Sequence, residues 1–276
     1  MSLDLDRITH PLRLAAGSHQ PGSGKGCAMN VISYINGDTK ITDFPECSAR
    51  PLARMVQYLN DRLADTDGFL SPEDSVTVLD IGWRTVGTAG APREIVWHWL
   101  ADLLVHPEMG VVKHARRADV AAALRRVAEL CMRESRGDRP TRAEWNSARS
   151  AAYEAKKAAA ADAYAAAYAA AAAAADAYAA AYAAAAAAAD AYAAADAYAA
   201  AYAAADAYAA AYAAAAAAAD AYAAADAYAY AYAAAKQARI TFTRWAVEHW
   251  RELAGLDDAT DIDAAAVDSA LARIGG

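Results

Sequence analysis

The chain lacks the residue patterns that mark several common classes of protein. It has three cysteines, and an odd number at wide spacing argues against a disulfide framework. Its net charge of −8 offers no basic surface for nucleic acid. The first residues, MSLDLD, do not contain a basic region followed by an apolar run, so they are not a secretory signal. We therefore expect a cytoplasmic protein that does not bind nucleic acid.

Helix-breaking residues are absent from a long internal stretch, because no Gly or Pro occurs between Thr141 and Ala254. Inside it, Ala158–Ala235 contains 58 Ala, 13 Tyr, 7 Asp and nothing else, and we call this segment the repeat. It has no His, Cys, Ser or Lys to act as a nucleophile or base. Because Ala is the best helix former, the composition predicts helix. A single helix from Thr141 to Ala254 would be roughly 170 Å long.

The internal order of the repeat leaves its arrangement open. Asp recurs 14 residues apart in the first part, a period of two heptads that keeps Tyr within one stripe and suits a paired helix. Every Asp and Tyr also falls on an even position, a period of two that is typical of strands. Ala and Asp are poor strand residues, which favours helix. A rod, a hairpin, a coiled-coil-like pair and a β-type stack are the alternatives.

The repeat is not expected to enter a membrane. A charged Asp near the centre of a membrane helix costs about 2.5–3.5 kcal/mol on insertion scales. Asp recurs here every 6 to 14 residues, so any window long enough to cross a bilayer contains at least one.

Helix signals continue on both sides of the repeat and predict an all-α protein. Ser71-Pro72-Glu73-Asp74 is a strong helix start, Pro92 opens a helix to Val105, and Thr141 with Glu144 matches a capping box. We predict a helical domain over 1–136, a helical repeat over 141–235 and amphipathic helices over 236–276. Apolar residues predict that the end of the repeat docks on another surface: Ile240, Phe242, Trp245, Val247, Trp250 and Leu253.

One group of residues in the N-terminal domain has chemical potential. Cys27 precedes an apolar segment, and a thiol at a helix N-terminus has its thiolate favoured by backbone donors. With His19 as base and Asp43 as orienting group, Cys27 would be a candidate nucleophile. His19, Cys27 and Cys47 could instead bind zinc, although neither CxxC nor HxxxH spacing is present. The third interpretation, which we favour, is that both cysteines are small buried apolar residues. No other cofactor is indicated, because Gly24-Lys25 is followed by Gly26 rather than by the Ser or Thr of a phosphate loop.

The same region carries a resemblance. The run GSHQPGSGKGCAMNVISYINGDTKITDFPECSARPLARMVQYLND, with the later GTAG at 87–90, resembles an uncharacterised family of actinobacterial and actinophage proteins. Members of that family continue into an Ala-rich repeat and a short amphipathic helix. This chain has Asn30 where an acid is usual and Tyr where the repeat often has Trp. The resemblance implies a modular protein and directs attention to His19, Cys27, Asp43 and Cys47, without assigning them an activity.

These observations favour a non-enzymatic scaffold or interaction protein that forms a homo-oligomer or binds a protein partner through its repeat. The resemblance implies a phage-related origin. The alternative is a cysteine-dependent enzyme, or a head that binds a metal or small ligand, with the repeat as an oligomerising stalk.

Overall fold

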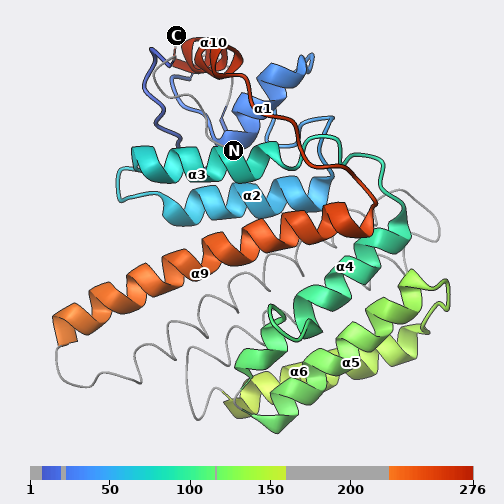
Figure 1. Cartoon of the computed structure of the whole chain (residues 1–276). Helices are drawn as coiled ribbons and strands as arrows, with labels where there is room; N and C mark the ends of the chain where they lie inside the picture. Colours follow the sequence, from blue (N-terminus) through green and yellow to red (C-terminus); the bar gives the residue numbers. More distant parts are fainter. Residues whose placement is uncertain (1–7, 20–22, 116, 160–223, 276) are drawn as a thin grey trace. The chain divides into compact units, whose positions relative to one another are not determined.

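A computed structural model describes residues 8–19, 23–115, 117–159 and 224–275 (Figure 1). Their helices are α1 (Ala28–Asn36), α2 (Arg50–Leu63), α3 (Pro72–Trp83), α4 (Arg93–Val105), the 3₁₀ helix η2 (Val111–His114), α5 (Ala118–Ser135), α6 (Arg142–Ala159), α9 (Ala224–Leu253) and α10 (Ala264–Gly275). Within these ranges no strand forms, and the only β-type pairings are two isolated bridges, Ala15 with Phe69 and Ser48 with Val86. The all-α prediction is confirmed. None of the described helices combines the length and apolar character needed to cross a bilayer.

The described helices belong to two compact units. Unit 1 is Met1–Ala91 with Val247–Gly276, and unit 2 is Pro92–Ala246. The sequence placed a boundary at 136–141, but α6 packs against α5 across this linker. The ring of Trp145 on α6 also lies 6.0 Å from that of Trp97 on α4. Aromatic packing therefore keeps α6 with α4 and α5 despite the Gly and Pro between them.

Two predicted helix starts are present as expected. At α3, the Ser71 hydroxyl accepts a hydrogen bond from the backbone N–H of Asp74 at 3.1 Å, and Pro72 occupies the first helical position. At α6, Thr141 Oγ1 accepts from the backbone N–H of Glu144 at 3.2 Å, and Glu144 Oε2 accepts from that of Thr141 at 2.7 Å. Both arrangements satisfy backbone donors that the first turn of a helix leaves exposed.

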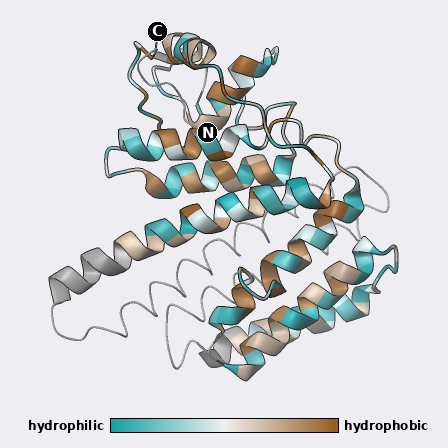
Figure 2. Ribbon diagram, in the orientation of Figure 1, coloured by the Kyte–Doolittle hydropathy of each residue, from teal (hydrophilic) through white to brown (hydrophobic). Residues whose placement is uncertain are grey.

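Unit 1 packs α1, α2 and α3 closely together, with α10 against α1. A Cβ atom added to Gly82 of α3 would lie 2.8 Å from Ile32 Cδ1, so a side chain at this position would require Ile32 to shift. Apolar and polar residues alternate around α2 and α3, as in amphipathic helices (Figure 2). The carboxylate of Asp268 on α10 is bound by the backbone N–H groups of Thr9 and His10, at 2.6 and 2.8 Å.

Unit 2 is held by aromatic side chains around α4. Fully buried Trp99 donates a hydrogen bond from Nε1 to the carbonyl of Ala246 in α9 at 2.7 Å. The rings of His106 and Trp245 lie 5.2 Å apart. The predicted docking of the segment after the repeat is therefore confirmed for this part of α9.

The ends of the repeat are helical and lie in the same unit. Ala158 and Ala159 finish α6, and residues 224–235 form the first part of α9, whereas 160–223 lie outside the described residues. Trp145 and Ala246 both contact α4. The rod, hairpin, coiled-coil-like and β-type arrangements predicted for the repeat fall on residues outside this description and stay predictions.

Candidate functional site

Asp43 lies at the centre of a buried polar network in unit 1, which we call the Asp43 network. Its side chain is buried and accepts hydrogen bonds from three donors. Asn30 Nδ2 donates to Oδ1 at 3.0 Å, and Gln57 Nε2 donates to Oδ2 at 3.0 Å. The Cys27 thiol donates to Oδ1 at 3.5 Å. The network thereby connects the start of α1, the loop after it and the middle of α2.

The network extends to the segment before α1. Gln57 Nε2 also lies 3.4 Å from Ser18 Oγ. Asn60 donates from Nδ2 to the carbonyl of Ala15 at 2.8 Å, and its Oδ1 accepts from the backbone N–H of Ala28 at 3.3 Å. His19 Nε2 lies 3.4 Å from the same Ala15 oxygen. The Ala15 carbonyl and Asn60 thereby connect His19 to the start of α1, while Cys27 is hydrogen-bonded directly to Asp43.

Their geometry differs from that of a nucleophile with its base. In the part of the chain that the structure describes, no hydrogen bond joins His19 to Cys27 or to Asp43. Burial, and then the negative charge of Asp43, raise the pKa of the Cys27 thiol far above its ordinary value of 9.0. Backbone N–H groups of Asn30 and Met29 oppose this shift but do not overcome it. The thiolate expected at this helix N-terminus is therefore disfavoured, and Cys27 is a protonated thiol that donates to Asp43.

Cys27 instead takes part in the start of α1. It precedes the helix in extended conformation, its backbone N–H donates to Asn30 Oδ1 at 3.0 Å, and its sulfur faces the N–H of Asn30. This is the reciprocal pattern of a capping box with a thiol in place of a hydroxyl. Cys27 therefore connects the helix cap to the Asp43 carboxylate.

Cys47 lies in a different part of unit 1 and acts through its backbone. Its carbonyl accepts hydrogen bonds from the N–H groups of Gly87 and Ala89, at 2.9 and 3.3 Å. The next residues bind the same turn, because Ser48 Oγ lies 2.7 Å from Thr85 Oγ1 and Ala49 N donates to Thr88 Oγ1 at 2.8 Å. These contacts give the GTAG segment a structural role.

A zinc site formed by His19, Cys27 and Cys47 is not assembled. Among the described residues, no group of three or more His, Cys, Asp or Glu side chains is placed to hold a metal ion. The Cys27 thiol donates its hydrogen to Asp43 Oδ1, and Cys47 Sγ lies 3.8 Å from Ser48 Oγ.

Sequence reasoning missed the amide side chains that hold the network together. Asn30, Gln57 and Asn60 are each at most 2% exposed, although amides are rarely buried without partners. Gln57 and Asn60 interrupt an otherwise apolar stripe of α2, which was an available signal. The amide of Asn30 can donate to Asp43, which a carboxylate at this position could not do.

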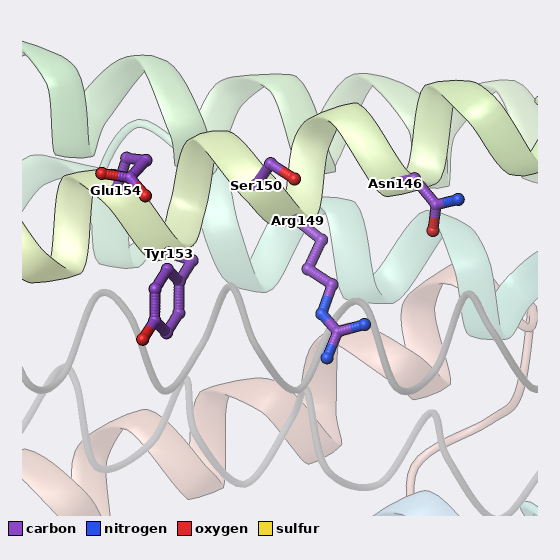
Figure 3. A pocket seen from close by; sticks show the side chains of 5 residues that line it. All are labelled: Asn146, Arg149, Ser150, Tyr153 and Glu154. Atoms are coloured by element: carbon purple, nitrogen blue, oxygen red, sulfur yellow. The ribbon is translucent and has the colours of Figure 1, made fainter.

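A second candidate surface lies on α6 in unit 2. We call it the α6 outer face: Asn146, Arg149, Ser150, Tyr153 and Glu154. These side chains project from one side of the helix and line an open hollow of about 380 Å³ (Figure 3). Tyr153 is 61% exposed. The opposite side of α6 is buried.

Comparisons with protein-family models, with curated proteins and with solved structures give no match to this chain. The resemblance drawn from the N-terminal motif therefore stays a prediction.

Proposed function

We propose that this chain is a non-enzymatic scaffold protein that self-associates through its Ala/Tyr/Asp repeat. The observation that carries the proposal is the anchoring of both repeat ends in unit 2. Trp145 of α6 packs on Trp97, and Ala246 of α9 accepts a hydrogen bond from Trp99. A spacer would connect two separate bodies, whereas both described ends of this repeat belong to one compact unit.

The composition of the repeat supports association with a second copy. A helix exposed on all sides has little tertiary stabilisation to offset its ordering cost. Tyr supplies a large apolar body with a polar end, and Ala allows two helices to approach closely. The first two 14-residue periods place Tyr164, Tyr168, Tyr178 and Tyr182 within one stripe. Pairing this stripe between copies would give these four Tyr side chains the apolar partners that an isolated helix lacks.

The Asp43 network supports the non-enzymatic interpretation over a cysteine-dependent enzyme. Its thiol is protonated and buried, and its carboxylate is occupied by three structural donors. A nucleophilic cysteine needs an accessible thiolate beside a base.

The experiment is light scattering on the full chain over a wide concentration range. We expect the mass to rise from monomer to a defined oligomer. Replacing the four Tyr of the first two periods with Ala should raise the dissociation constant by at least about tenfold, because aromatic contacts dominate such interfaces. The matched control replaces the same four residues with Phe, which keeps the rings and should preserve association. A mass that stays monomeric at every concentration would refute the proposal and favour a repeat folded on its own chain.

A further inference from the structure

The last helix, α10, packs on unit 1 through a small apolar surface. Among the described helices, α1, α2 and α3 each pack against the other two, whereas α10 packs against α1 (Figure 1). The side chains that α10 buries are Ala264, Val267, Ala270 and Leu271, and three of these four are small. A helix of 12 residues is marginal by itself, so α10 depends on its contacts with unit 1.

One carboxylate of α10 binds the N-terminal segment of unit 1. Asp268 accepts hydrogen bonds from the backbone N–H groups of Thr9 and His10, at 2.6 and 2.8 Å. The Thr9 hydroxyl donates to Asp268 Oδ2 at 2.9 Å, and His10 Nδ1 lies 3.0 Å from Asp268 Oδ1. The backbone N–H of His10, above all, lowers the pKa of Asp268 well below its ordinary value, so the carboxylate is charged at neutral pH. Hydrogen bonds to a charged acceptor are stronger than neutral ones, which makes Asp268 the main polar attachment of α10 to this segment.

The segment before α10 has a fixed end and a free end. Trp83 of α3 donates from Nε1 to the carbonyl of Thr260 at 2.8 Å, which fastens this segment to α3. The first turn of α10 supplies its own cap, because Asp263 Oδ1 accepts from the backbone N–H of Ala265 at 3.1 Å. A movement of α10 would therefore keep its cap intact and turn about residues 261–263.

We propose that α10 is a strap that opens from unit 1 while α1, α2 and α3 stay folded, and that Asp268 is the latch that holds it closed. This inference goes beyond the proposed self-association and does not depend on it, because every contact that it uses lies within unit 1. Opening removes Ile274 from Gly26, where an added Cβ atom would lie 2.7 Å from Ile274 Cγ2. It also removes Ser269 from Tyr34, whose side-chain oxygens are 3.5 Å apart. The open form thus exposes the surface around Gly26 and Tyr34 that α10 covers in the closed form.

Hydrogen exchange of the full chain, measured by mass spectrometry, tests the strap. Peptides covering 264–275 report on α10, and peptides covering 50–63 report on α2. In the parent chain, α10 should exchange at least about tenfold faster than the slowest amides of α2, because a local opening costs less free energy than unfolding of unit 1. Its rate should also depend less on added urea, since the opening exposes less surface. Equal rates with equal urea dependence in the two helices would overturn the proposal, because α10 would then open only when unit 1 unfolds.

Two substitutions on opposite sides of the contact test the latch. Asp268→Ala should speed the exchange of α10 by about tenfold or more, because the hydrogen bonds to its carboxylate exist only in the closed form. Thr9→Glu should have a similar effect, because it places a second carboxylate beside Asp268. The matched control, Asp261→Ala, removes an exposed carboxylate from the segment before α10 and should leave the rate unchanged. Parent rates in both latch variants would refute the role of Asp268.

A further substitution separates local opening from unfolding of unit 1. Ile81→Val deletes one methyl group from the fully buried core side of α3, which stays packed whether α10 is closed or open. It should speed the exchange of α2 by about fivefold and leave that of α10 unchanged. The substitution is mild, so that unfolding of unit 1 stays rarer than the opening of α10. An equal rise in both helices would show that α10 opens together with α2, and the proposal would fail.

Discussion

Units 1 and 2 are stabilised by different kinds of contact. In unit 1, side chains form hydrogen bonds with backbone groups and with one another across long sequence separations. Asn60 bonds both Ala15 and Ala28, and Asp43 accepts hydrogen bonds from three side chains. In unit 2, indole rings fill the space between helices, with Trp97 against Trp145 and Trp99 under α9. Unit 1 therefore adds a network of directional hydrogen bonds to its apolar core, whereas indole rings fill unit 2 around α4.

This difference explains why the two units look so different in sequence. A buried donor or acceptor that loses its partner incurs its full desolvation cost, so each position of the Asp43 network accepts few residue types. The result is a compact motif that can be recognised in the sequence. Apolar packing accepts many residues of similar volume. Unit 2 can therefore be stabilised by a few large aromatic side chains although it includes a repeat of only three residue types.

The largest effect should come from removing the main apolar anchor of unit 2. Trp99→Ala should lower the free energy of unfolding by about 4 kcal/mol, because it leaves a cavity of indole size and removes the hydrogen bond to Ala246. Urea unfolding followed by circular dichroism measures it. Trp99→Phe keeps one aromatic ring, loses the N–H donor and part of the indole volume, and should cost about 1–2 kcal/mol. Equal losses in the two variants would show that the hydrogen bond, rather than volume, stabilises unit 2.

Removing the centre of the unit 1 network should have the next largest effect. Asp43→Ala leaves Asn30, Gln57 and Cys27 without their shared acceptor and should cost about 3 kcal/mol in urea unfolding. The control, Asp67→Ala, removes a carboxylate from an exposed turn and should change stability by less than about 0.5 kcal/mol. If the two variants changed the free energy of unfolding by equally small amounts, the hydrogen bonds of the Asp43 network would not distinguish unit 1 from unit 2.

The elements that sequence reasoning found are those determined by local chemistry. The starts of α3 and α6 follow from Ser71 and from Thr141 with Glu144, because caps involve residues only three apart. The grouping of α6 with α4 was not predictable in this way. It depends on Trp97 meeting Trp145, which are far apart in sequence, while the Gly and Pro between α5 and α6 indicated a boundary.

At the candidate site, too, sequence reasoning could not predict what depends on packing between residues far apart in the chain. The sequence grouped His19, Cys27 and Asp43 as a candidate site, and the structure joins Cys27 to Asp43 while His19 contacts the Ala15 carbonyl. It could not give the ionisation of Cys27, because the helix N-terminus favours a thiolate while burial and Asp43 oppose it. The outcome depends on how deeply the thiol is buried, which only the packed structure determines.

The smallest effect should appear at the join between α5 and α6, and only in acid. Arg133 first, and then the Thr141 backbone N–H and hydroxyl, lower the pKa of Glu144 from its ordinary value of 4.5 to about 2. Because the folded pKa is depressed, the stabilisation from Glu144 is complete above pH 4.5 and is lost as the pH falls toward 2. Glu144→Gln should therefore be less stable than the parent at pH 6, and the two unfolding curves should converge by pH 2. Asp268, whose carboxylate is bound by the backbone N–H groups of Thr9 and His10, is present in both the parent and the variant. Its protonation in acid therefore changes both unfolding free energies equally and cancels in their difference. A difference independent of pH would show that Glu144 acts through its uncharged contacts, and urea unfolding at pH 2, 3, 4 and 6 decides between the two cases.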